Sequence, residues 1–181
     1  CMSERASAVE IVRVGKHWRL SCFQHVPHPI QKVFSFFGAA RNLERLTPGF
    51  LRFQFRRLPT EPLQAGATID YQLRLHGIPV WWRTRIDEWC PPRRFVDVQI
   101  RGPFRRWHHT HEFMVDGSGT VIKDTVNFDL YFRSLYRTPV LRWINTDLRL
   151  IFEYRRRQTT KILAGDKLVE VVERTSEVSF K

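Results

Sequence analysis

The sequence predicts an α+β fold in which a curved antiparallel β-sheet of about seven strands surrounds one long C-terminal α-helix. Two observations support this. Successive segments up to about residue 131 alternate apolar and polar residues and are separated by short turns, which is typical of β-strands. After these segments the spacing of apolar residues changes to that of a helix. Because antiparallel neighbours can be joined by tight turns, the strands are expected to form a meander.

The N-terminal part predicts one strand followed by two short helices, which lie between the first two strands. Residues 17–24 alternate weakly and form the expected first strand. After Pro29, apolar residues recur at helical spacing over residues 30–37, and proline is well placed at a helix start. A second short helix is expected over about 39–46, ended by Thr47-Pro48-Gly49.

Six further strands follow, and their limits are set by turn residues. The segment Asp116-Gly117-Ser118-Gly119 is the strongest hairpin signal in the chain. The expected strands cover residues 50–58, 68–75, 80–89, 95–101, 104–115 and 120–131.

A helix of about 25 residues is expected at the end of the domain. Thr138 and Pro139 supply an N-cap and a first-turn proline, and Gly165 is suited to end the helix. One stripe of the helix is apolar, and it contains Leu141, Ile144, Leu148, Ile151 and Ile162. The concave face of the sheet is the one surface large enough to bury this stripe.

The chain length predicts a single domain. Its 181 residues are enough for a sizeable core, and we find no internal repeat and no Gly/Ser-rich linker. We therefore divide the chain into an N-terminal extension (1–16), one ligand-binding domain (17–165) and a C-terminal tail (166–181) that is either loose or a partner-dependent strand.

The cysteines and the N-terminus bear on the compartment. Cys1, Cys22 and Cys90 include no CxxC pair and no disulfide-framework spacing, and Cys22 is expected to be a small buried apolar residue. The N-terminus lacks the basic-then-apolar pattern of a signal peptide. No apolar run approaches the roughly 20 residues that span a bilayer. We expect a reducing, cytoplasmic location.

The formal net charge is +12, and most of the cationic residues are arginines spread along the chain. A basic surface attracts anions through long-range electrostatics. It is compatible with an anionic membrane surface or an acidic partner, although a solvated exterior is the favoured interpretation. No RNP-like aromatic motif or other nucleic-acid signature is present, so nucleic acid is not favoured as a partner.

Several strings resemble the SRPBCC superfamily, also called START-like or Bet v 1-like, and in particular a bacterial ligand-binding subgroup. The similarity covers roughly residues 17–163. The strings are Val33-Phe34-x-Phe36-Phe37, Asn42-Leu43-Glu44-x-Leu46-Thr47-Pro48, Gly66-x-x-Ile69-x-Tyr71, Gly77-Ile78-Pro79-x-Trp81-Trp82-x-Thr84, Phe95-Val96-Asp97-x-Gln99-x-x-Gly102-Pro103-Phe104, Trp107-x-His109-x-His111-x-Phe113 and Gly119-Thr120-x-x-x-Asp124.

This resemblance implies a helix-grip fold with an internal cavity. It implies little about chemistry, because the superfamily includes lipid carriers, hormone receptors, polyketide cyclases and hydroxylase domains, and function depends on the site. The sequence departs from the pattern over residues 131–137, where a bulky, basic segment replaces the glycine-containing segment that often precedes the last helix.

Strand alternation predicts a polar group on the inner face of the sheet. Residues two apart in a strand point to the same side. The sets expected to face inward are Trp82/Thr84/Ile86/Glu88, Phe95/Asp97/Gln99, Trp107/His109/His111/Phe113 and Ile122/Asp124/Val126/Phe128. The hairpin predicts that Asp124 lies near one of the two histidines. A network of hydrogen bonds that satisfies its own members is an equally good interpretation of these polar residues.

The candidate site follows from these sets. The candidate catalytic residues are His109, His111, Asp97 and Asp124, because histidine titrates near neutrality and can move a proton. The expected ligand-binding residues are Tyr71, Trp82, Thr84, Asp97, Gln99, Trp107, His109, His111, Phe113, Asp124, Ile144 and Leu148. We assign no cofactor and no metal, because two histidines two apart on a strand are ordinary neighbours and no motif such as HExxH supports a site.

Three hypotheses about function remain open. The favoured one is binding or carriage of a small, mostly apolar molecule, either lipid-like, isoprenoid-like or aromatic, in an internal cavity. The second is a cyclase or dehydratase type of enzyme that uses the inward histidines and aspartates; we favour binding over catalysis. The third is a basic surface that binds RNA or anionic lipid, which predicts steep salt dependence.

Overall fold

The computed structural model describes residues 9–57, 59, 61–132 and 139–178, with side chains as far as Gly165. Eight strands form one antiparallel sheet in the order β1-β2-β8-β7-β6-β5-β4-β3. The strands are β1 (Glu10–Val14), β2 (His17–Val26), β3 (Gln54–Arg57), β4 (Thr68–Leu75), β5 (Ile78–Cys90), β6 (Arg94–Arg101), β7 (Arg106–Asp116) and β8 (Gly119–Asp129). The helices are α1 (Ile30–Gly38), α2 (Asn42–Arg45), the 3-10 turn η1 (Gly49–Leu51) and α3 (Pro139–Val178).

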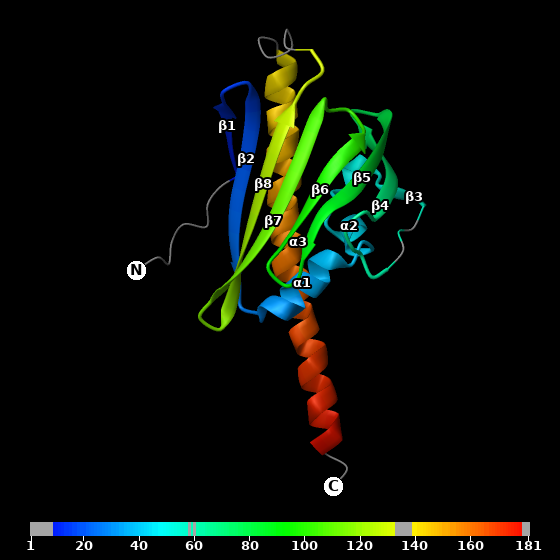
Figure 1. Ribbon diagram of the computed structural model, residues 1–181. Helices are drawn as coiled ribbons and strands as arrows, with labels where there is room; N and C mark the ends of the chain where they lie inside the picture. The colour runs from blue at the N-terminus through cyan, green and yellow to red at the C-terminus, as the bar shows by residue number, and fades with distance from the viewer. Residues whose placement is uncertain (1–8, 58, 60, 133–138, 179–181) are drawn as a thin grey trace.

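The predicted helix-grip architecture is confirmed. The sheet curves around the long helix α3, and the short helices α1 and α2 lie at one end of the sheet (Figure 1). Both short helices fall between β2 and β3, in the interval where the sequence predicts them. The expected strand over 50–58 is shorter than predicted, because η1 occupies its start and Arg52 takes a left-handed conformation with φ of 44°.

The sheet has one more strand than the alternation analysis assigned. Residues 10–14, which we placed in an N-terminal extension, form β1 and pair with β2. Gly15 turns the chain between the two strands with a φ of 59°, a conformation that suits glycine. The added strand is anchored by apolar burial, since Val9 and Ile11 belong to the main core cluster. A five-residue strand in which Ile11 alone is buried is too short for periodicity to detect.

The last helix is longer than predicted. It does not end at Gly165 but continues to Val178, so the expected tail is largely helical over residues 166–178. A glycine inside a helix costs only about 1 kcal/mol relative to alanine. No proline follows Gly165, so the chain contains no strong signal that ends the helix there.

The two largest of three apolar clusters among the described residues fill the space between the sheet and the helices. The larger cluster includes Leu141, Leu148 and Phe152, which lie on the predicted stripe of α3 or beside it. The second cluster lies under α1, where Phe34 and Phe37 pack edge-on against Phe113 of β7. The helices therefore cover the concave face of the sheet. Within the residues described, no helix is long and apolar enough to pass through a bilayer.

Candidate functional site

A pocket of about 190 Å³ opens between the concave face of the sheet, α3 and the segment around α2. This volume far exceeds the roughly 10–15 Å³ that one water molecule requires. Its walls are mainly apolar side chains, such as Leu46, Phe53 and Ile151. Three of the polar side chains in the wall, Asp97, His109 and His111, lie together in a polar region, and the others include Asn42, Asp147 and Arg155.

The polar region is built by three neighbouring strands. In the register of the sheet, Asp97 on β6 lies opposite His109 on β7, and His111 on β7 lies opposite Asp124 on β8. Since residues two apart in a strand share a face, both histidines and both aspartates meet on the inner side. We call these four residues the His–Asp cluster.

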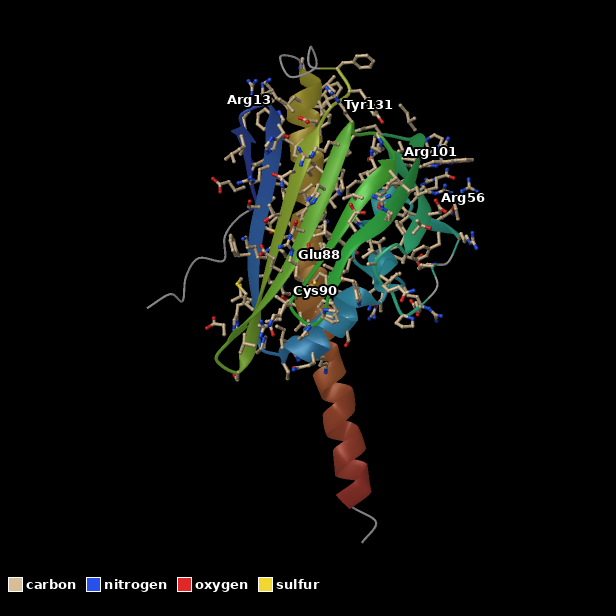
Figure 2. All side chains as sticks on the ribbon, in the orientation of Figure 1. Arg13, Arg56, Glu88, Cys90, Arg101 and Tyr131 are labelled. Atoms are coloured by element: carbon tan, nitrogen blue, oxygen red, sulfur yellow. The ribbon has the colours of Figure 1, made fainter. Side chains whose placement is uncertain are left out.

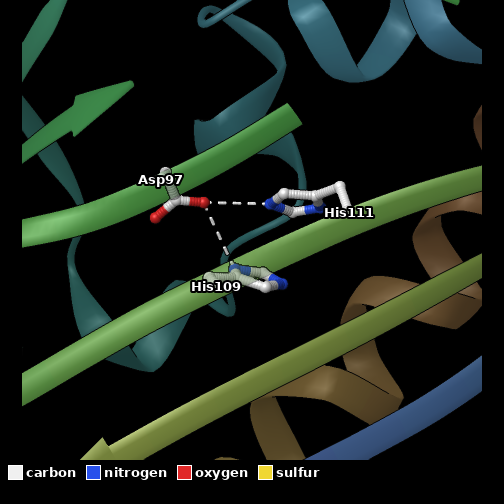
Figure 3. A group of neighbouring side chains, drawn as sticks. All are labelled: Asp97, His109 and His111. Atoms are coloured by element: carbon white, nitrogen blue, oxygen red, sulfur yellow. Dashed lines mark hydrogen bonds and ion pairs between the residues drawn. The ribbon is translucent and has the colours of Figure 1, made fainter. Parts of the chain in front are cut away.

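Each histidine of the cluster contacts both aspartates. His111 Nε2 lies 3.0 Å from Asp97 Oδ2, and His109 Nδ1 lies 3.4 Å from the same oxygen (Figure 3). On the other side, His109 Nε2 lies 2.9 Å and His111 Nδ1 lies 2.7 Å from Asp124 Oδ1. The histidine rings are 3.7 Å apart between centroids. The four side chains therefore form a closed group.

Burial and charge shift the pKa values of the cluster in different directions. Burial, then repulsion from His111, lowers the pKa of His109 to about 4. Burial also acts to lower the pKa of His111, but the charge and hydrogen bond of Asp124 outweigh it and raise that pKa above its usual value. Burial acts to raise the pKa of both aspartates, yet attraction to the histidines prevails and lowers them, Asp124 most strongly.

At neutral pH both aspartates are therefore carboxylates and His109 is neutral with one N–H, whereas His111 holds its proton more strongly than an ordinary imidazole. The contact of His109 Nε2 with Asp124 is shorter than that of Nδ1 with Asp97, which places the single proton on Nε2. The Nδ1 lone pair of His109 then faces a carboxylate oxygen of Asp97, and two acceptors oppose one another.

Aromatic side chains hold the histidine rings in place. Phe95 stacks on His111 with centroids 4.1 Å apart and planes at 20°. Phe152 of α3 meets His109 edge-on at 5.5 Å. Arg155, one turn further along α3, lines the pocket and lies 5.4 Å above the ring of Phe37. The cluster is thus fixed from the sheet and from the helix.

Most of the residues predicted to bind a ligand line the pocket. The nine that line it are Tyr71, Trp82, Thr84, Asp97, Trp107, His109, His111, Ile144 and Leu148. Asp124 lies behind both histidines, outside the pocket wall. Phe113 points inward but packs under α1 in the second cluster.

Gln99 does not reach the pocket because its side chain closes a turn. Its amide donates to Phe104 O at 2.6 Å, and Phe104 N donates back to its oxygen at 3.3 Å. Gly102 lies against the same side chain, where a Cβ would come within 2.4 Å of Gln99 Oε1. Strand alternation predicted which side of the sheet Gln99 lies on, but it could not predict these hydrogen bonds with Phe104.

Glu88 is a correction to the predicted inner face. The register between β5 and β6 shifts between Ile86 and Glu88, which marks a β-bulge, and a bulge reverses the alternation beyond it. Glu88 therefore points outward and pairs with Arg94 at 3.2 Å. Trp89 takes the inward place and packs on Phe34.

The sequence analysis missed one whole wall of the pocket. Residues from the end of α1 to β3 line it, and these include Ala40, Leu43, Leu46, Leu51 and Phe53. Their apolar spacing was visible as short helices, but a pattern in one segment does not reveal which cavity it borders. Arg155 was also missed, because it lies among three consecutive arginines that look like a solvated face.

The sequence matches one protein-family model over most of its length. A family model described as "Polyketide cyclase / dehydrase and lipid transport" matches residues 26–153, more than half of the chain. The chain belongs to this family. The match agrees with the predicted SRPBCC resemblance and covers every strand that contributes to the His–Asp cluster. A comparison with curated proteins finds no match to the sequence.

Solved structures show the same fold at low sequence identity. Protein Ms6760 from Mycobacterium smegmatis superposes with a TM-score of 0.63 at 12% identity, over 87% of this chain and 98% of that one. Major latex-like protein 151 from Panax ginseng gives 0.61 at 12% identity, over 81% and 97%. TTHA0849 from Thermus thermophilus gives 0.55 at 19% identity, over 78% and 96%. These likenesses concern the fold alone.

Proposed function

We propose that the protein binds a small, mostly apolar molecule in the pocket between the sheet and α3. The observation that carries this proposal is the composition of the pocket wall, which is mainly apolar and includes a polar group of Asp97, His109 and His111. Pockets of this composition are the usual sites for small ligands, in which the apolar wall supplies affinity and the polar groups set orientation. The family description, which includes lipid transport, supports the same proposal.

The wall also indicates the polarity of the ligand. Arg155 Nε and Trp82 Nε1 are buried donors without a hydrogen-bond partner among the described residues, and both side chains line the pocket. A buried unpaired donor costs about 1–3 kcal/mol. A ligand oxygen that accepts from one of these groups removes that cost. The proposed ligand is therefore a lipid-like, isoprenoid-like or aromatic body that carries a carbonyl, hydroxyl or carboxylate oxygen.

The test is native mass spectrometry of the protein purified from its own host, followed by denaturing extraction of whatever is bound. A stoichiometric apolar molecule with an oxygen group is the expected result. Salt-sensitive recovery of nucleic acid or anionic lipid on an otherwise empty protein would contradict the pocket proposal and favour the basic exterior as the binding surface.

A matched pair of variants locates the ligand. Ile144→Trp places a large side chain in the pocket wall, whereas Leu150→Trp adds the same side chain to the same helix at a position that is 50% exposed. Ile144→Trp is expected to abolish co-purification of the ligand, and Leu150→Trp to leave it intact. Equal occupancy in both variants would place the ligand outside the pocket.

Catalysis is the second candidate function, and the opposed acceptors of the His–Asp cluster favour it. The Nδ1 lone pair of His109 has no proton donor opposite it, so it can take a proton from a bound molecule. The family description names cyclase and dehydrase chemistry, in which a general base of this kind can move a proton. Turnover of the extracted molecule that disappears in His109→Gln, while binding persists, supports catalysis; binding without any chemical change in the wild type supports carriage.

A further inference from the structure

Three donor atoms converge at the polar end of the pocket. Asp97 Oδ2, one ring nitrogen of His109 and one of His111 all lie within 4.8 Å of one another. Asp97 Oδ2 is 3.0 Å from His111 Nε2 and 3.4 Å from His109 Nδ1. In a tetrahedral zinc site, with bonds of about 2.0–2.1 Å, neighbouring donor atoms are separated by about 3.3–3.5 Å. The separation of Asp97 Oδ2 from His109 Nδ1 matches that value, and its separation from His111 Nε2 is slightly shorter (Figure 3).

The fourth member of the His–Asp cluster occupies the position of an orienting carboxylate. Asp124 Oδ1 lies 2.9 Å from His109 Nε2 and 2.7 Å from His111 Nδ1, on the far side of each ring from Asp97. Histidines that bind metals almost always donate their other N–H to a carboxylate or carbonyl, which fixes the tautomer and the ring. Asp124 alone of the four side chains is absent from the pocket wall.

The cluster holds more nitrogen–carboxylate contacts than two neutral imidazoles can fill with N–H groups. Four imidazole nitrogens face carboxylate oxygens, but two neutral imidazoles carry only two N–H groups. Filling all four contacts requires two imidazolium ions in a closed, buried group. A cation bound to His109 Nδ1, His111 Nε2 and Asp97 Oδ2 would use one lone pair of each imidazole, and the remaining nitrogen of each ring lies 2.7–2.9 Å from Asp124 Oδ1. Two carboxylates and one divalent cation also balance in charge.

We propose that Asp97, His109 and His111 bind a divalent transition-metal ion at the polar end of the pocket, with Asp124 orienting both imidazoles. Two imidazole nitrogens and one carboxylate oxygen suit zinc or ferrous iron better than magnesium or calcium, which prefer oxygen ligands. All three ligands line the pocket, so the remaining coordination positions face the space proposed for the ligand. No sequence motif reveals this site, because its ligands come from two strands, β6 and β7.

The test titrates Zn²⁺ into EDTA-treated, dialysed protein by isothermal calorimetry, with Mg²⁺ as the comparison ion. One Zn²⁺ per chain and no Mg²⁺ binding at the same concentration are expected. Asp124→Asn keeps the shape of its side chain and is expected to weaken Zn²⁺ binding by roughly 10–100-fold. Asp97→Asn removes a ligand charge and is expected to weaken it by more than Asp124→Asn does.

A matched control separates this site from surface binding. His76 and Asp147 form an exposed pair 2.7 Å apart that also offers a nitrogen and an oxygen to zinc. His76→Gln is expected to leave the affinity unchanged. Loss of binding in His76→Gln, or unchanged binding in Asp97→Asn, would overturn the proposal, as would a wild type that binds no stoichiometric Zn²⁺.

X-ray absorption on the wild-type zinc complex makes the test independent of whether the variants fold. Two imidazoles and oxygen ligands around the metal are expected. Sulfur ligands, or fewer than two imidazoles, would contradict the proposed set. The titration uses the metal alone, so failure here leaves the ligand-binding proposal standing, and an empty pocket leaves the metal proposal standing.

Discussion

Two adjacent tryptophans on β5 contrast the inner and outer faces of the sheet. Trp82 is 8% exposed, lines the pocket and meets Trp107 edge-on at 5.2 Å. Trp81 is 55% exposed, and the guanidinium groups of Arg56 and Arg101 lie 5.4 and 5.3 Å from its ring. The same residue type therefore fills the interior on one face and interacts with solvated cations on the other, and the alternation of the strand decides which.

The charged groups of the two faces differ in the same way. On the inner face, charges occur within the His–Asp cluster, where every member contacts two others. On the outer face, charges occur as pairs open to water, such as Asp70 with Arg83 and Glu112 with Lys123. Figure 2 shows Arg56 and Arg101 projecting from the strands into solvent. Removing one charge should therefore matter far more inside than outside.

The largest expected effect comes from breaking the His–Asp cluster. Asp124→Ala removes the carboxylate that contacts both buried histidines and should lower the free energy of unfolding by about 3–5 kcal/mol. Urea denaturation in the presence of EDTA measures this loss. Asp70→Ala, which removes a carboxylate from an exposed pair on the outer face, is the matched control and should change stability little. Similar losses in both variants would contradict the contrast.

The two tryptophans give the next largest difference. Trp82→Ala should destabilise the protein by about 3 kcal/mol, because it removes buried aromatic surface and leaves a cavity. Trp81→Ala should cost about 0.5–1 kcal/mol, the scale of an exposed cation–π contact. Thermal and urea denaturation of the two variants, compared with the wild type, provide the measurement. A larger loss for Trp81→Ala would show that the outer face is covered by something in solution.

A smaller effect is expected from an ion pair across the outer face. Glu112 and Lys123 lie directly opposite one another on β7 and β8, with 2.9 Å between Oε2 and Nζ. A double-mutant cycle with Glu112→Gln and Lys123→Met should give a coupling of about 0.2–1 kcal/mol. Raising the salt concentration should reduce that coupling. A coupling above 2 kcal/mol would place this pair with the buried charges instead.

Cys22 and Cys90 allow the difference between the inner and outer faces to be tested by chemical reactivity instead of stability. Cys22 is buried, and burial followed by the charge of Asp124 raises the pKa of its thiol, whereas Cys90 is exposed. Because the thiolate is the reactive form, a thiol reagent at pH 8 should label Cys90 in the folded protein and Cys22 only after unfolding. Mass spectrometry of the Cys1→Ser variant counts the labels. Early labelling of Cys22 would mean that the inner face opens readily.

The sequence predicted the faces of the sheet wherever the strands are regular. On β7 and β8 the pairing has no register shift, so alternation alone placed His109, His111 and Asp124 inside. On β5 the bulge moved Glu88 outward, and no residue in that segment signals a bulge. Strand alternation therefore predicts which residues face inward in regular strands, and it fails beyond a β-bulge.

What alternation cannot supply is the pairing between segments far apart in the chain. Asp97 meets the histidines because β6 pairs with β7 in one register, and that register depends on the whole sheet. The pocket wall from Ala40 to Phe53 depends on how α1 and α2 fold back over the sheet. These are tertiary results, which a pattern within one segment does not contain.

The sheet does not close on itself, so its two edges are open to association with other protein molecules. An open sheet has two edge strands, β1 and β3, whose unpaired backbone groups can recruit strands from other molecules. β3 has only four residues, carries Arg56 and Arg57, and is distorted by a register shift at that point. Shortness, charge and irregularity all discourage edge-to-edge association. On the β3 side, the sheet is protected against aggregation by its own geometry.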